Sequence, residues 1–255
     1  MEGVADLPFG IDFGGTGIKG APVDLDQGEF AAERERIRTP SPSTPEAVAE
    51  VFVDLLSRFP DSRGPVGVTV PAVVRHGVVK SAANIDPAWV GTDADQLFTE
   101  ATGRDVHVVN DADAAGLAEA RYGAAKGRSG LVIVTTLGTG IGSAFIHNGV
   151  LVPNSELGHL EIDGHDAESR AANSARERDE LSFKHWAKRL VKYYNTLEML
   201  FSPDLFVVGG GISKQADEFL PMVAEKLETE IVPAQLLNKA GVVGAALCAV
   251  EELAE

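Results

Sequence analysis

The chain has 255 residues, 44% of them apolar and 24% charged, which is ordinary for a globular protein. A formal net charge of −16 argues against a general nucleic-acid-binding or membrane-surface protein, because both need a basic surface, and the single cysteine excludes an intrachain disulfide. No apolar run approaches the roughly 20 residues of a membrane span and the N-terminus has no signal-peptide pattern, so we expect a cytoplasmic protein with neither nucleic-acid nor membrane partners.

Short β-rich runs alternate with amphipathic helices along the chain, which predicts an α/β fold. The expected strands cover residues 8–13, 20–25, 66–70, 105–109, 131–136, 143–147 and 205–208. The first expected helix follows Ser43, with Glu46 at capping-box spacing and Pro45 in the first turn. Further helices are expected over residues 111–122 and 180–201. The second of these carries an apolar face formed by Trp186, Leu190, Tyr193, Tyr194 and Leu197.

The segment IDFGGTGIKG, residues 11–20, contains the spacing G-x-G-x-x-G. In a dinucleotide-binding fold this spacing must open a helix, whose N-terminus binds the pyrophosphate. The residues after Gly20 read APVDLDQGEF, where Pro22 and the alternation of apolar positions indicate a strand. We therefore predict a β-hairpin instead of a dinucleotide-binding turn. The chain also lacks the Gly-Lys-Ser/Thr of a Walker A motif.

A glycine-rich hairpin can still bind phosphate, because its backbone N–H groups can approach an anion closely. Here Thr16 adds a hydroxyl, Lys19 a positive charge and Asp12 a carboxylate suited to a metal ion bound through water. A tight turn without a ligand is the alternative. The segment TLGTGIGSA, residues 136–144, repeats the strand–glycine turn–strand pattern, which favours a pair of phosphate-binding loops in two similar halves.

In order and spacing these motifs resemble the ROK group of sugar kinases, in the actin/hexokinase/Hsp70 superfamily. IDFGGTGIKG is similar to the family's first phosphate loop, VTTLGTGIGSA to its second, and FVVGGGIS (206–213) to the segment beside the nucleoside end of the donor. The resemblance covers nearly the whole chain. It implies contacts with the phosphate donor from Asp12, Gly14, Gly15, Thr16, Lys19, Thr136, Gly138, Thr139, Gly140, Gly210 and Gly211.

The same resemblance implies an α/β, two-lobed, ribonuclease H-like fold with glycine-rich phosphate hairpins, whose lobes close around the sugar. The expected small lobe holds residues 1–111, joined by a C-terminal helix over residues 241–255. The expected large lobe holds residues 112–240.

Asn110 and Asp111 follow the apolar run VHVV and precede a predicted helix. Both side chains should therefore lie at the carboxyl end of a strand, where open α/β sheets bind ligands. Phosphoryl transfer needs a carboxylate that orients or deprotonates the acceptor hydroxyl. Residue type favours Asp111 as the general base and Asn110 as a partner of sugar hydroxyls; the alternative is a helix N-cap. The resemblance places the family's base at Asp111.

Glu156, His159 and Glu168 form a second polar cluster in the sequence. Carboxylates and imidazole suit pairs of sugar hydroxyls because they offer directional acceptors and donors, whereas their order fits no zinc-binding pattern. The resemblance implies that all three hold the sugar. Asn84 is a further candidate for a sugar contact, or else a turn residue before Asp86.

Many members of the family carry a cysteine-rich zinc loop in the region that here reads EIDGHDAESRAA, residues 161–172. Without cysteine in this region we expect no structural zinc. The variant loop resembles that of the bacterial polyphosphate-dependent members, which transfer the terminal phosphate of inorganic polyphosphate, and often of ATP, to the 6-hydroxyl of glucose or mannose. The resemblance thus implies a Mg²⁺-dependent glucokinase, with the metal near Asp12.

The run KHWAKRLVK, residues 184–192, is the densest basic patch of this acidic chain. Lys184, Lys188 and Lys192 share one helix face and Arg189 adjoins them. We call these four residues the predicted polyphosphate track; the alternative is a solvated face that pairs with nearby acids. The apolar side of helix 180–201 is a candidate homodimer surface.

Two other functions fit parts of the pattern. One is an ATP-only ROK hexose or amino-sugar kinase, against which the basic helix and the cysteine-free loop argue. The other is a non-catalytic sugar sensor, which usually carries an added DNA-binding segment. The chain begins at the first phosphate strand and contains Asp111, so we expect an enzyme.

Overall fold

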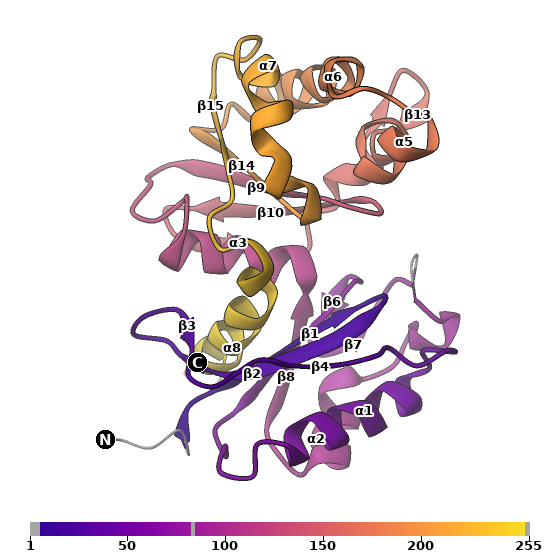
Figure 1. Cartoon of the computed structure of the whole chain (residues 1–255), viewed down its shortest axis with the longest axis vertical. Helices are drawn as coiled ribbons and strands as arrows, with labels where there is room; N and C mark the ends of the chain where they lie inside the picture. The colour runs from indigo at the N-terminus through magenta and orange to yellow at the C-terminus, as the bar shows by residue number, and fades with distance from the viewer. Residues whose placement is uncertain (1–5, 83–84, 253–255) are drawn as a thin grey trace. The chain divides into compact units, whose positions relative to one another are not determined.

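The structure, a computed structural model, describes residues 6–82 and 85–252. The chain divides into two compact units, unit 1 with residues 1–118 and 239–255 and unit 2 with residues 119–238. Each unit has a main sheet of its own (Figure 1). Each also has its own hydrophobic core. Helix α3 (Asp111–Tyr122) begins in unit 1 and ends in unit 2.

The sheet of unit 1 has the strand order β3-β2-β1-β5-β8, with β4 also paired to β2. β1 (Phe9–Gly14) and β2 (Gly17–Asp24) are antiparallel, and β5 (Val66–Val70) and β8 (Val106–Asn110) continue parallel to β1. The short strands β3 (Glu29–Phe30) and β4 (Glu35–Ile37) lie along β2. The predicted hairpin after residue 14 is confirmed, and the dinucleotide-binding turn is excluded.

Alternating residues of β1 face two different layers of helix. Phe9, Ile11 and Phe13 belong to the core that includes α1 (Pro45–Ser57) and α2 (Ala94–Thr102). The other face of the sheet packs on α8 (Ala240–Glu252). There Gly10 lies against the backbone of Val242, so closely that a Cβ atom would collide with its carbonyl oxygen.

Unit 1 also contains the hairpin of β6 (Val74–Arg75) and β7 (Val78–Val79), followed by a 3-10 turn at Pro87–Trp89. The first helix differs in one detail from the prediction. Its N-cap is Thr44, whose hydroxyl accepts a hydrogen bond from the Ala47 amide at 3.3 Å, instead of Ser43. Pro45 sets the boundary because it occupies the first helical position, so the preceding residue is the cap.

The sheet of unit 2 has the order β11-β10-β9-β14-β15. β9 (Leu131–Leu137), β10 (Ile141–His147) and β11 (Val150–Val152) form an antiparallel meander, whereas β14 (Leu205–Gly209) and β15 (Glu230–Pro233) run parallel to β9. The second predicted glycine-rich hairpin is therefore confirmed, between β9 and β10.

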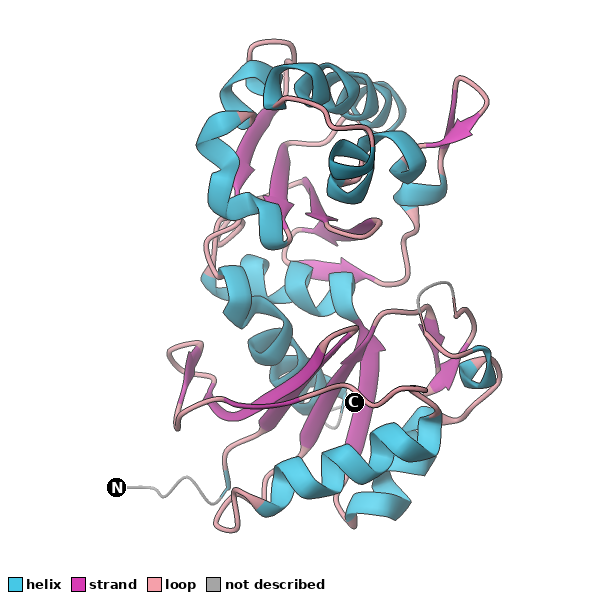
Figure 2. Cartoon of the chain, turned by 45° about the vertical axis from the view of Figure 1, so that its right-hand side comes forward, coloured by secondary structure: helices cyan, strands magenta, loops and turns pink. Residues whose placement is uncertain are grey.

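Helix α6 (Phe183–Phe201) is the longest helix of unit 2 and covers its sheet (Figure 2). The predicted apolar face is confirmed, because Trp186, Leu190, Tyr193, Tyr194 and Leu197 are all buried. Shorter elements complete the unit: the hairpin of β12 (Glu161–Ile162) and β13 (His165–Asp166), α4 (Glu168–Ala171), α5 (Asn173–Arg178) and α7 (Leu220–Ala224), with 3-10 turns at Leu157–His159, Gly211–Glu218 and Leu237–Lys239. Within the described ranges, none of the helices is long and apolar enough to cross a membrane.

Candidate active site

The first glycine-rich turn is the two-residue connection Gly15-Thr16 between β1 and β2. Both residues are exposed, so their backbone is accessible to a ligand. The turn is held from outside: the Thr39 hydroxyl donates to the Gly14 carbonyl at 2.6 Å, and Arg36 Nη2 donates to the Thr16 carbonyl at 3.1 Å. The turn is thus fixed by side chains that leave its outer surface open.

Arg36 was not predicted as a site residue. It lies on β4 directly opposite Lys19 of β2, which brings two cations to the base of the turn. Gly17 makes room for the guanidinium, because a Cβ at that position would lie 2.5 Å from Arg36 Nε. A guanidinium and an ammonium beside exposed glycine backbone form a suitable surface for a phosphate chain.

Asp12 points to the face of the sheet that carries α8. Its carboxylate accepts from Lys19 Nζ at 2.9 Å and from the Thr69 hydroxyl at 3.3 Å. Gly241, in the first turn of α8, adjoins it, since a Cβ there would lie 3.2 Å from Asp12 Cγ. The positive end of the helix dipole and the lysine both favour a negative charge here.

Asp12 suits a Mg²⁺ ion of the kind that keeps several waters. In the part of the chain that the structure describes, no three His, Cys, Asp or Glu side chains are grouped as a metal site. Mg²⁺ in phosphoryl-transfer enzymes is commonly held by one or two carboxylates together with substrate phosphates. A single anchored carboxylate next to a phosphate-binding turn meets that requirement.

Asn110 ends β8 and Asp111 begins α3, as the sequence predicts for this strand end. Asn110 is the helix cap: its Oδ1 accepts from the amides of Ala112 at 2.8 Å and Asp113 at 3.1 Å, and its Nδ2 donates to the Ala72 carbonyl at 3.0 Å. Among the described residues, the second N–H of the Asn110 amide has no partner and can serve a ligand. Asp111 is half-buried, with Oδ1 accepting from the Ala112 amide at 2.9 Å.

The second glycine-rich turn, Gly138-Thr139-Gly140, joins β9 to β10 and follows Thr136. The start of α5 anchors it, because the Ser174 hydroxyl donates to the Thr139 carbonyl at 2.5 Å and its amide to the Gly138 carbonyl at 3.1 Å. Gly210 has a positive φ of 84° and lies against the backbone of Leu137. The second and third glycine segments, which are far apart in sequence, therefore meet within unit 2.

Glu168 connects the predicted sugar loop to this second turn. Its Oε2 accepts from the Ile141 amide at 3.0 Å, in a space that exists because Gly140 and Gly158 have no side chains. Behind it lies Tyr193, fully buried, whose hydroxyl has no hydrogen-bond partner among the described residues. Burial raises the pKa of Tyr193 well above its ordinary value, and the charges of Tyr194 and Glu168 raise it further.

The imidazole of His159 lies between two carboxylates. Its Nδ1 is 3.3 Å from Asp166 Oδ2 and its Nε2 is 4.0 Å from Glu156 Oε2. Asp166 was not predicted as a site residue; it is brought to His159 by the β12–β13 hairpin, and nothing in its local spacing indicates the contact. A carboxylate on Nδ1 fixes the ring and leaves Nε2 for a ligand hydroxyl.

Glu156 has a pKa raised above its ordinary value of 4.5, mainly because burial disfavours its charged form. The neighbouring His159 opposes this shift and Glu168 adds to it. The structure thus brings together all three predicted sugar residues of unit 2. Asn110 and Asp111 belong to unit 1, and Asn84 lies outside the described residues.

The predicted polyphosphate track is divided in the structure. Lys184 and Lys188 are exposed and have no ion-pair partner within the described ranges. Arg189 instead pairs with Asp179 at 2.7 Å, and Lys192 pairs with Asp163. Two of the four cations are therefore already neutralised.

Comparison with known proteins gives consistent likenesses. The profile of the ROK family matches residues 8–174. The polyphosphate glucokinase of Mycobacterium tuberculosis is 51% identical over 245 residues, covering 96% of this chain and 91% of the relative. The structure of an inorganic polyphosphate/ATP-glucomannokinase from Arthrobacter sp. strain KM is 57% identical with a TM-score of 0.92, covering 97% of this chain and 100% of that one.

A ROK hexokinase from Thermus thermophilus is 27% identical with a TM-score of 0.77, covering 97% of this chain and 99% of the other. These likenesses confirm the predicted α/β fold of the actin/hexokinase type.

Proposed function

This chain belongs to the ROK family, and from that membership we propose that it transfers the terminal phosphate of inorganic polyphosphate to the 6-hydroxyl of glucose. The observation that carries the proposal is the 51% identity to a polyphosphate glucokinase along almost the full length of both chains. The product is glucose 6-phosphate. The chain is an enzyme, a phosphotransferase of the kinase class.

Asp111 is the proposed general base, which orients the 6-hydroxyl and takes its proton as the phosphoryl group transfers. Its position at the start of α3 supports this role, because the helix N-terminus favours a carboxylate. Asn110 contributes the amide hydrogen that has no partner among the described residues. We assign the other sugar hydroxyls to Glu156, His159 and Glu168, whose arrangement offers both acceptors and donors.

The two glycine-rich turns are the proposed phosphate sites, with Lys19 and Arg36 as the cations of the first. Asp12 would hold Mg²⁺, which when bound offsets the charge of the donor phosphates. Because Asp12 already accepts from Lys19 and Thr69, its carboxylate is fixed in position. Gly210 and Gly211 are assigned to the nucleoside end of ATP when ATP is the donor.

The second candidate function is a broader kinase activity, in which ATP also serves as donor and mannose also serves as acceptor. It is favoured by the likeness to the Arthrobacter polyphosphate/ATP-glucomannokinase. Lys184 and Lys188 are the part of the predicted polyphosphate track that remains accessible to a long polyanion.

A homodimer is proposed from the surface of unit 2. Val150 and Val152 are exposed on β11, the outermost strand of its sheet, and Met199 is 74% exposed near the end of α6. Phe145 of β10 lies opposite Val152 of β11, and its ring contacts that of Phe201 in α6, which connects the edge of the sheet to α6 as one apolar surface. Apolar surface beside an unpaired strand edge favours burial by a second copy.

The test of the function is glucose 6-phosphate formation with Mg²⁺ and a single donor, either long-chain polyphosphate or ATP. Turnover with polyphosphate is the expected result. Turnover with ATP alone would support the kinase assignment but refute polyphosphate as the donor. No turnover with either donor would refute the kinase activity.

A further inference from the structure

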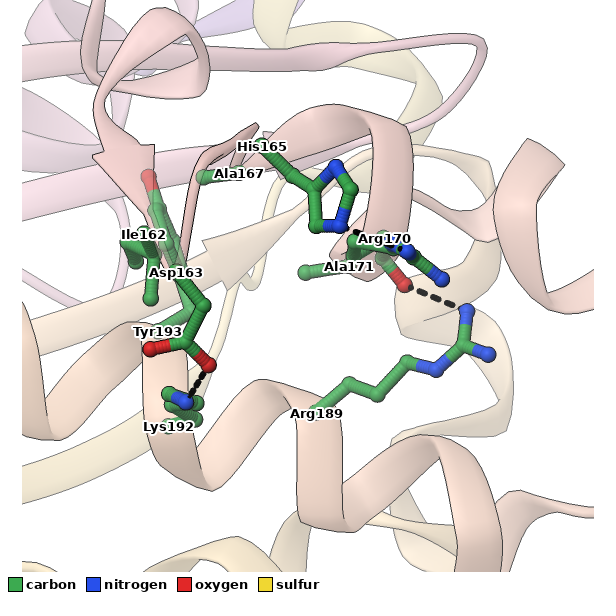
Figure 3. Close-up of a pocket in the computed structure, with 9 residues that line it drawn as sticks. All are labelled: Ile162, Asp163, His165, Ala167, Arg170, Ala171, Arg189, Lys192 and Tyr193. Carbon is green, nitrogen blue, oxygen red and sulfur yellow. Dashed lines mark hydrogen bonds and ion pairs between the residues drawn. The ribbon is translucent and has the colours of Figure 1, made fainter.

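Unit 2 contains a cavity of about 310 Å³ that the proposed reaction does not use. Its walls are the β12–β13 hairpin, α4 and α6 (Figure 3). The volume falls at the lower end of the range for small-molecule sites. All of its lining residues belong to unit 2, so the cavity is a feature of that unit alone.

Cations dominate the polar part of the wall. Arg170, Arg189 and Lys192 line the cavity, whereas Asp163 is the only carboxylate among its lining residues. Two of the cations are paired, Lys192 with Asp163 and Arg189 with Asp179. In a chain of net charge −16, this local excess of positive charge points to an anionic ligand.

Arg170 is the cation that is left for a ligand. Among the described residues no carboxylate pairs with it; its Nη2 contacts His165 Nε2 at 2.8 Å. A guanidinium can only donate, so in this contact His165 Nε2 is the acceptor. The Arg189 guanidinium lies on the same wall and donates to the Arg170 carbonyl at 3.1 Å (Figure 3). Two guanidinium groups on one wall match the geometry by which arginine binds phosphate.

Apart from His165 and the Tyr193 hydroxyl, the rest of the wall is apolar. Ala167, Ala171 and Tyr193 are buried and Ile162 is partly buried beside them. Ile162, Ala167 and Ala171 offer no hydrogen bond to a bare polyphosphate chain, whose oxygens need hydrogen bonds or water along their whole length. They do offer contact to a ligand with an apolar or planar body.

We propose that this cavity binds a small phosphate monoester with a planar body, of the nucleoside monophosphate type. Arg170 holds the phosphate, with Arg189 beside it on the same wall, and the body lies against Ile162, Ala167 and Ala171. Lys192 remains at the opposite side of the mouth, paired with Asp163.

Such a ligand would act on the sugar loop through α4. That helix is a single turn, Glu168–Ala171, and carries Glu168 and Arg170 two residues apart. A ligand that restrains Arg170 also restrains Glu168, whose carboxylate reaches the Ile141 amide. This coupling rests on the sugar-binding role proposed above for Glu168, whereas binding itself does not. Occupation should therefore lower the KM for glucose without a comparable change in kcat.

Calorimetric titration of the full chain with AMP, in the absence of sugar and donor, tests the binding. We expect Arg170→Gln to weaken AMP binding at least ~10-fold, because the substitution removes a charge-assisted contact. Lys226→Ala is the matched control, because Lys226 is an exposed cation of the same unit that does not line the cavity. Lys19→Met tests whether AMP binds at the proposed donor site and not in this cavity.

Loss of AMP binding in Arg170→Gln, with unchanged binding in both Lys226→Ala and Lys19→Met, would support the proposal. Loss in Lys19→Met alone, or no AMP binding at all, would overturn it. If tripolyphosphate bound through Arg170 and AMP did not, the ligand would be the inorganic polymer and the monoester assignment would be wrong. Because heat is measured without turnover, the result stands even if the proposed function fails.

Discussion

Asp111 and Asn110 are adjacent in sequence, yet their replacement should affect different properties. In Asp111→Asn the new side chain keeps an oxygen that can accept from the Ala112 amide, the bond that Asp111 Oδ1 makes at 2.9 Å. The fold should therefore be preserved. The asparagine cannot take a proton from the acceptor hydroxyl, so we expect turnover to fall by about 10²- to 10⁴-fold with little change in glucose binding.

Asn110→Ala should instead destabilise unit 1. The substitution removes the N-cap of α3, at a cost of about 0.5–2 kcal/mol. It also leaves the buried Ala72 carbonyl without the donor that lies 3.0 Å away, at a cost of about 1–3 kcal/mol. The expected loss is roughly 1.5–5 kcal/mol, which corresponds to a decrease in Tm of at least about 3 °C in a chain of this size.

Both variants would be compared with the original chain by thermal unfolding, glucose titration and initial rates. Asp111→Asn should keep its Tm and its glucose affinity but lose turnover. Asn110→Ala should show a lower Tm as its main effect. Near-normal turnover in Asp111→Asn would refute the base assignment. An unchanged Tm in Asn110→Ala would show that the three hydrogen bonds of its amide contribute far less than the geometry implies.

Four further variants test the remaining assignments. Arg36→Met should raise the KM for the phosphate donor about 10-fold, since a charge-assisted contact contributes about 1.5–3 kcal/mol; an unchanged KM would exclude Arg36 from the donor site. Replacing Lys184 and Lys188 together by alanine should raise the KM for long polyphosphate more than that for ATP, and equal effects on both donors would remove them from the track. Because the pKa of Glu156 is raised, the folded chain binds more protons than the unfolded chain just above pH 4.5, so stability falls as pH rises through that window. A series of Tm against pH should show this decrease in the original chain and not in Glu156→Gln. Met199→Lys should convert the proposed homodimer into monomers in light-scattering measurements, and a persistent dimer would place the interface elsewhere.

Much of the fold could be predicted because its signals are local. Pro22 and the alternation after Gly20 indicated a strand where a dinucleotide-binding fold needs a helix, and the hairpin is confirmed. The face of α6 could be predicted from its 3.6-residue periodicity. The shift of the N-cap from Ser43 to Thr44 shows the limit of such patterns, because both residues are suitable caps and Pro45 decides between them.

The site was less accessible to sequence reasoning because its contacts are not local. Arg36 reaches the Thr16 carbonyl only through the pairing of β4 with β2, and β4 is too short to show an alternation of its own. Asp166 reaches His159 through the β12–β13 hairpin. Spacing also does not reveal that Arg189 and Lys192 are paired with Asp179 and Asp163.

The packing of α8 on the sheet of unit 1 bears on how the chain folds as it is made. Unit 2 is continuous in sequence, so its core can form during synthesis. Unit 1 receives the helix that lies against Gly10 and Gly67 only after all of unit 2 has been translated. Asp12 obtains its neighbour Gly241 at that same late moment, although its own strand β1 precedes unit 2 in the sequence. The part of the proposed donor site around Asp12 is therefore completed only after residues 240–252 have been translated and α8 has packed on β1.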